Sequence, residues 1–146
     1  MLEKMNLLGA LVAHIIYISS VVTFLSRLLF RIQPGHWIGY PLLLMAFPLG
    51  YLLLEAPQLQ RPMLYYLQVG LMLVCILMLF LLDYVLKIEF RQTQWMVISF
   101  VVLYFAGIGG MLGVAASAGR AWTISAVILF FVTAVLTFVQ RAVTGI

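Results

Sequence analysis

The sequence predicts an all-α, polytopic membrane protein: about five transmembrane helices in a compact bundle that forms one domain over residues 1–146. Hydrophobic residues make up 66% of the chain and charged residues 8%, against about 25% charged residues in a soluble domain. Because lipid offers no hydrogen-bond partner to an open backbone, apolar segments in a membrane form helices. Five stretches are long enough to cover the roughly 30 Å hydrocarbon core: 7–30, 37–54, 63–86, 94–118 and 121–140.

The first span, 7–30, follows Lys4 and ends in the basic segment Arg27–Arg31. Its length and the absence of a small-residue cleavage pattern indicate a retained span rather than a signal peptide. His14 lies about seven residues, or roughly 10 Å, inside the apolar segment. A neutral imidazole bonded to a neighbouring helix is the first interpretation of His14, with proton-coupled or quinone-contacting roles and haem ligation as alternatives.

The second span, 37–54, is the least regular of the five. Pro41 and Pro48 each remove a backbone donor and tend to kink a helix, so we expect a kinked crossing, with a broken or re-entrant segment as the alternative. Glu55 follows at the end of the span. We expect an interfacial carboxylate there, paired with Arg61 or Arg120, rather than a buried acid.

One face of the third span, 63–86, carries polar residues. On a helical wheel that face holds Gln68, Met72, Cys75, Leu79 and Asp83. We expect this face to point into the bundle, because polar groups turned towards lipid are penalised. Asp83 is interpreted first as an anchor for a basic side chain such as Arg27, and second as a coupling site.

Small residues line one side of the fourth span, 94–118, and predict close helix packing. They are Ser99, Ala106, Gly109, Gly110, Gly113 and Ser117. The fifth span, 121–140, offers a complementary face with Ala126 and Thr133, after a short link at Gly119. The two spans are therefore predicted to form a close-packed hairpin. Self-association through the same residues, or a glycine-broken helix at a substrate site, are the alternatives.

Lysine and arginine counts predict the orientation. With five crossings, five basic residues lie on one side of the membrane and three on the other. Because cytoplasmic loops are enriched in basic residues, the N-terminus is expected outside and the C-terminus in the cytoplasm, in the cell membrane.

Several chemistries are excluded by residue type and spacing. His14 and His36 are 22 residues apart, about 33 Å along a helix, so they cannot hold one haem between them within a chain. With these histidines and the lone Cys75, no metal cluster, disulfide or cofactor is expected. The scattered basic residues exclude a nucleic-acid-binding run. The candidate polar site residues that remain are His14, Glu55, Gln68, Asp83 and Arg120.

Three functions fit this inventory. The first is a non-catalytic accessory or scaffold subunit of a membrane complex, which associates with the bilayer and with a membrane-protein partner or a second copy of itself. The second is a small homo-oligomeric transporter or channel with a pore between protomers. The third is a membrane redox or lipid-modifying protein that uses His14.

Overall fold

The computed structural model describes residues 2–30, 37–58, 60, 62–86 and 94–144. These residues are almost entirely helical, and they contain no strand. Four helices are long and apolar enough to cross a membrane: Glu3–Phe30, Met63–Val85, Gln94–Ala116 and Arg120–Val143. A fifth apolar stretch, Tyr40–Glu55, is shorter. The predicted all-α bundle of about five helices is confirmed, and the apolar helices of spanning length indicate a membrane protein.

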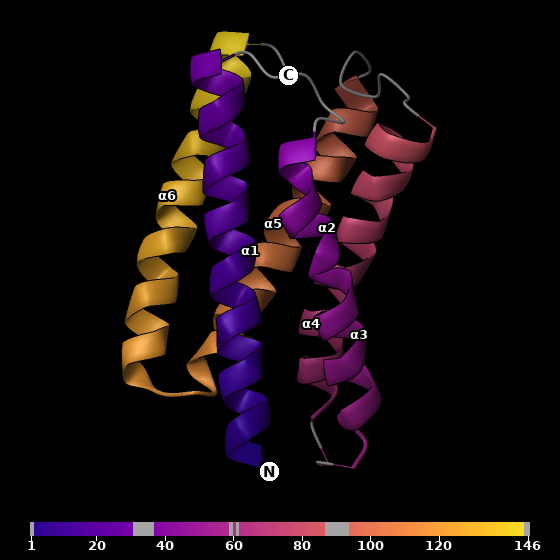
Figure 1. The fold of residues 1–146 in the computed structure, drawn as a ribbon, viewed down its shortest axis with the longest axis vertical. Coiled ribbons are helices and arrows are strands. Elements are labelled where there is room, and N and C mark those ends of the chain that lie inside the picture. Colours follow the sequence, from indigo (N-terminus) through magenta and orange to yellow (C-terminus); the bar gives the residue numbers. More distant parts are fainter. Residues whose placement is uncertain (1, 31–36, 59, 61, 87–93, 145–146) are drawn as a thin grey trace.

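Successive helices run in alternating directions along the bundle (Figure 1). Helix α1 begins at the lower end in this view, and α6 finishes at the upper end beside the last turn of α1. The elements in order are α1 Leu2–Phe30, η1 Trp37–Gly39, α2 Tyr40–Leu44, α3 Ala46–Glu55, α4 Met63–Leu79, η2 Phe80–Val85, α5 Gln94–Ala116 and α6 Arg120–Thr144. The end that holds the last turn of α1 is called the Arg27 end below.

The predicted kink in the second span lies between α2 and α3, at Met45. Pro48 has no N–H, and its ring clashes with the carbonyl four residues earlier. That carbonyl belongs to Leu44, where α2 ends. The segment from α2 to α3 covers Tyr40–Glu55, about 24 Å of helix at 1.5 Å per residue. This pass is therefore shorter than the roughly 20 residues that a full crossing needs.

Helix α4 changes to π-helical geometry in its last turn and a half. The N–H of Leu86 donates to the carbonyl of Leu81 at 2.8 Å, and this bond from residue i+5 to residue i is the pattern of a π-helix. Asp83 lies in this π-helical segment and is buried. Met72 and Cys75 are buried on the same helix, so the polar face predicted for the third span does point into the bundle.

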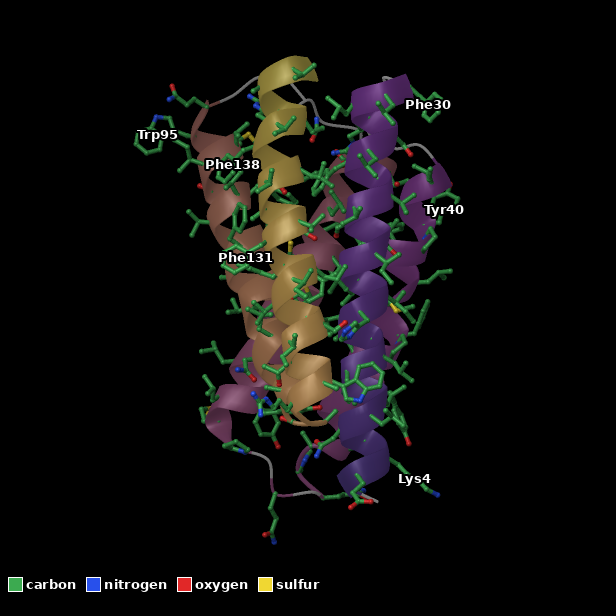
Figure 2. The ribbon with its side chains drawn as sticks, turned by 90° about the vertical axis from the view of Figure 1, so that its left-hand side faces the viewer. Lys4, Phe30, Tyr40, Trp95, Phe131 and Phe138 are labelled. Atoms are coloured by element: carbon green, nitrogen blue, oxygen red, sulfur yellow. The ribbon has the colours of Figure 1, made fainter. Side chains whose placement is uncertain are left out.

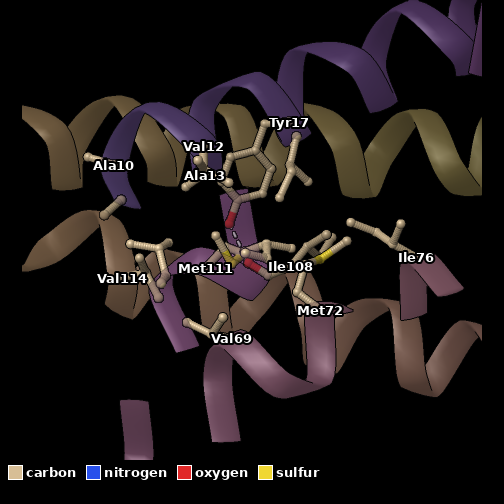
Figure 3. Close-up of a cluster of buried hydrophobic side chains, with 14 of the residues drawn as sticks. Ala10, Val12, Ala13, Tyr17, Val69, Met72, Ile76, Ile108, Met111 and Val114 are labelled. Carbon is tan, nitrogen blue, oxygen red and sulfur yellow. Dashed lines mark hydrogen bonds between the residues drawn. The ribbon is translucent and has the colours of Figure 1, made fainter. Parts of the chain in front are cut away.

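The middle of the bundle is filled by apolar side chains from α1, α4 and α5 (Figure 3). The Tyr17 hydroxyl is the polar group in this cluster, and it donates a hydrogen bond to the carbonyl of Ile108. The largest side chains with less than 2% exposure are Tyr17, Ile16, Leu49, Leu52, Met72, Ile76, Ile108 and Met111.

Helices α5 and α6 form the predicted hairpin around a short turn, with Gly119 at a φ of 138° that favours glycine. The rings of Phe105 and Phe138 stack across the hairpin with centroids 5.6 Å apart. Phe138 lies on the same side of α6 as Phe131 (Figure 2). The stacked rings of Phe105 and Phe138 therefore pack this side of α6 against α5.

The small residues of α5 were predicted to pack against the last span. Their closest contacts are instead with α4. A Cβ added at Gly107 would lie 3.2 Å from the Cα of Met72, and one at Gly110 would lie 3.0 Å from the Cα of Gln68. By contrast, a Cβ at Gly109 would meet nothing within 4 Å, and the rest of the predicted stripe, apart from Gly110 and Gly113, is exposed: Ser99, Ala106 and Ser117. The helical wheel averages over a whole span, whereas two crossing helices touch over a few turns.

Candidate functional site

His14 joins α1 to α6. Its Nδ1 lies 2.8 Å from the carbonyl oxygen of Ala10, and its Nε2 lies 3.0 Å from Oγ of Ser125. A carbonyl can only accept, so Nδ1 carries the proton, and a neutral ring then accepts at Nε2 from the Ser125 hydroxyl. The indole of Trp122 packs edge-on against the imidazole, with ring centroids 5.0 Å apart. Both ring nitrogens of His14 are thus engaged in contacts within the chain.

Three of the other candidate polar residues, Gln68, Glu55 and Arg120, lie on helices other than that of His14. Gln68 lies on α4, and its side-chain amide packs over Gly113 of α5, where an added Cβ would come within 2.1 Å of Nε2. Glu55 is half-buried at the last residue of α3, and Arg120 is exposed at the first residue of α6. His14, Gln68, Glu55 and Arg120 therefore lie on four different helices.

The Arg27 end holds the buried charged residues. Arg27 on α1 is 8% exposed and Asp83 is 5% exposed. The guanidinium carbon of Arg27 lies 5.9 Å from the centroid of the Phe24 ring. Arg27 is therefore buried within the bundle. A burial this complete is expensive for a cation in a membrane and marks a candidate functional position.

A cavity of about 100 Å³ lies beside Arg27 and is partly open. Helices α1, α5 and α6 form its walls, and one residue each from α2 and α4 completes it. The lining residues are Ser20, Thr23, Phe24, Arg27, Leu42, Leu79, Val97, Phe100, Val101, Tyr104, Thr137, Gln140 and Arg141. None of the predicted polar site residues is among these lining residues. Asp83 lies one helical turn after the lining residue Leu79.

Two neighbouring buried hydroxyls in this cavity make no hydrogen bond of good geometry. Oγ of Ser20 and the hydroxyl oxygen of Tyr104 are buried and make no hydrogen bond within the part of the chain that the structure describes. Thr23 and Thr137 differ, because their hydroxyls donate to the carbonyls of Ser19 and Thr133. Buried hydroxyls are nearly always hydrogen-bonded in proteins, so an orphan pair indicates a place for an occupant.

The polar groups of the cavity are hydroxyls, one side-chain amide and two guanidinium groups. None of the described residues that line it is a histidine, cysteine, aspartate or glutamate. Among the described residues, no group of three or more such side chains could hold a metal ion.

The chain matches no protein-family model, no curated protein and no solved structure. The functional interpretation therefore rests on the geometry of the bundle.

Sequence reasoning missed the cavity, although part of its signal is visible. Ser20, Thr23 and Arg27 follow one another at helical spacing on α1, and Gln140 precedes Arg141 near the end of α6. Tyr104 gives no such signal, because an aromatic residue in an apolar span is expected in the core.

Proposed function

We propose that this chain is a non-catalytic accessory or scaffold subunit of a membrane complex. The observation that carries the proposal is the apolar cluster across the middle of the bundle, built from α1, α4 and α5 (Figure 3). Ile16, Met72 and Ile108 in this cluster have 0% exposure. A polar solute would have to displace these apolar side chains to pass through the bundle from one end to the other.

The cavity does not change this conclusion about transport. It is lined by residues of the Arg27 end, from Ser20 to Arg27 on α1 and from Thr137 to Arg141 on α6. The apolar cluster around Tyr17 lies further along α1, towards its beginning. A pore between several copies of the chain would be independent of this interior, and it is an outcome of the experiment below.

The contacts of His14 argue against the redox alternative. Ligation of haem iron or a metal through either ring nitrogen would break the bond to Ala10 or the bond to Ser125. The ring would also have to leave its contact with Trp122. These contacts support a role for His14 in holding α1 against α6.

The orientation that we propose, with the N-terminus outside and the C-terminus in the cytoplasm, is supported by the lysine and arginine count of the sequence, whereas the described residues place two basic side chains at each end of the bundle. Arg27 and Arg141 line one cavity at one end of the bundle. Lys4 lies at the opposite end, where α6 also begins with Arg120 (Figures 1 and 2). The remaining basic residues in the count, Arg31, Arg61, Lys87 and Arg91, lie outside the described residues.

Native mass spectrometry of the tagged chain, extracted gently from its own membrane, tests the accessory role. We expect a heteromeric assembly of fixed stoichiometry. A tagged polytopic protein of similar size, extracted from the same membrane, is the control that identifies proteins that co-purify non-specifically. A homo-oligomer would support the transporter or channel instead, and a monomer without a partner would refute the accessory role.

A further inference from the structure

Three properties of the cavity at the Arg27 end indicate the chemistry of a molecule that would bind there: its charge, its unpartnered hydroxyls and its apolar walls. It is bounded by one face each of α1, α5 and α6. The lining residues on α1 are Ser20, Thr23, Phe24 and Arg27, which recur at the spacing of a single helical face. These four residues therefore form one continuous wall of the cavity.

The charge of the lining is positive. Arg27 and Arg141 contribute two guanidinium groups, and the described residues that line the cavity include no acid. Both arginines and Asp83 also make further contacts within the protein. Asp83 is the buried carboxylate described at this end, one helical turn beyond the lining residue Leu79. Guanidinium groups bind phosphate through paired hydrogen bonds, and the low dielectric constant of a membrane interior strengthens such contacts. The lining therefore favours an anion.

The hydroxyls lie deeper than the charges. Ser20 precedes Arg27 by seven residues, which places it about 10 Å further along α1. The hydroxyl of Tyr104 on α5 is the second donor without a partner among the described residues. An occupant that satisfies these groups carries hydrogen-bond acceptors deeper than its anionic group.

The remaining described lining residues comprise the polar Thr23, Thr137 and Gln140 and six apolar side chains. The apolar lining residues are Phe24, Leu79, Val97, Phe100 and Val101, which are half-buried, and Leu42, which is buried. A free inorganic anion would leave this surface uncovered. An amphipathic molecule covers it.

We propose that this cavity binds the head group of an anionic phospholipid. The phosphate lies at Arg27 and Arg141, and the ester carbonyls of the glycerol accept hydrogen bonds from Ser20 and Tyr104. The acyl chains continue along the apolar wall of α5. The site adds a specific lipid to the accessory role and does not depend on it.

Lipid titration of the purified full chain, followed by native mass spectrometry, tests the site. The probes are phosphatidylglycerol, phosphatidylcholine and oleate in detergent micelles. We expect one phosphatidylglycerol per chain, with phosphatidylcholine at least about tenfold weaker because its choline cation opposes the two arginines. Equal affinity for the two phospholipids would overturn the proposal. Oleate that binds as tightly as phosphatidylglycerol would replace the phospholipid with a simple carboxylate and would also overturn it.

Three variants locate the site. Arg27→Gln is expected to weaken phosphatidylglycerol binding at least about tenfold, and Tyr104→Phe about fivefold through the loss of one hydrogen bond. Arg120→Gln removes an exposed arginine at the opposite end and is the matched control, with unchanged binding expected. Tyr104→Phe removes an oxygen that has no partner in the described residues, so it remains decisive if Arg27→Gln does not fold. Wild-type affinity in folded Tyr104→Phe would refute the site.

Discussion

The contact between α4 and α5 makes a sharp prediction from two neighbouring glycines. In Gly110→Ala the new methyl carbon would lie 3.0 Å from the Cα and 3.2 Å from the Cβ of Gln68. Ordinary contacts begin near 3.4 Å. Because the nearest atom belongs to the backbone, the two helices must move apart by about half an ångström, and overpacking of this kind costs about 1–3 kcal/mol.

Gly109→Ala is the matched control. Its new methyl group would meet nothing within 4 Å. Alanine is more favourable than glycine in a helix interior by about 0.5–1 kcal/mol, so this variant is expected to match or exceed the wild type in stability.

Unfolding of both variants in mixed micelles, with rising sodium dodecyl sulfate and intrinsic tryptophan fluorescence as the readout, measures the difference. We expect the midpoint of Gly110→Ala to fall below that of Gly109→Ala by the equivalent of about 1–3 kcal/mol. Equal midpoints would refute the close approach of α4 and α5 at this glycine.

Three further predictions concern the bundle and its orientation. Tyr17→Phe removes the hydrogen bond to Ile108 and is expected to lower the free energy of unfolding by about 0.5–1.5 kcal/mol in the same micelle assay, whereas unchanged stability would argue against the bond. A double-mutant cycle of His14→Ala and Ser125→Ala is expected to give a coupling energy of about 0.5–1.5 kcal/mol, and additive effects would contradict the contact. A reporter active only in the cytoplasm, fused to the C-terminus, is expected to give signal; a stable but silent fusion would reverse the proposed orientation.

The helices were predictable because membrane insertion leaves few choices. Apolar length fixed four spanning helices to within a few residues at either end, and the two prolines located the irregular second pass. Pro48 in particular explains why α2 ends at Leu44. The π-helical turn that contains Asp83 was not predictable, because no proline or glycine marks it.

The partners of each helix face were less predictable than the helices themselves. Gly107 was not among the predicted packing residues, yet it meets Met72, whereas the predicted Gly109 meets nothing within 4 Å. A wheel shows which residues share a side of one helix, but the crossing point depends on the neighbouring helix. The cavity was missed for the same reason, since Ser20 and Tyr104 lie on different helices that only the tertiary structure brings to one place.

The central claim is that the apolar middle of the bundle is dry and closed, and Cys75 reports on it directly. This residue is the chain's only cysteine, and its side chain is 2% exposed within the core cluster. The most direct measurement is labelling of the wild-type chain in intact membranes with a water-soluble maleimide, with denatured protein as the control. The structure predicts no labelling of Cys75 until the protein is unfolded. Rapid labelling of the folded chain would show that water reaches the middle of the bundle and would favour a transport function over the accessory role.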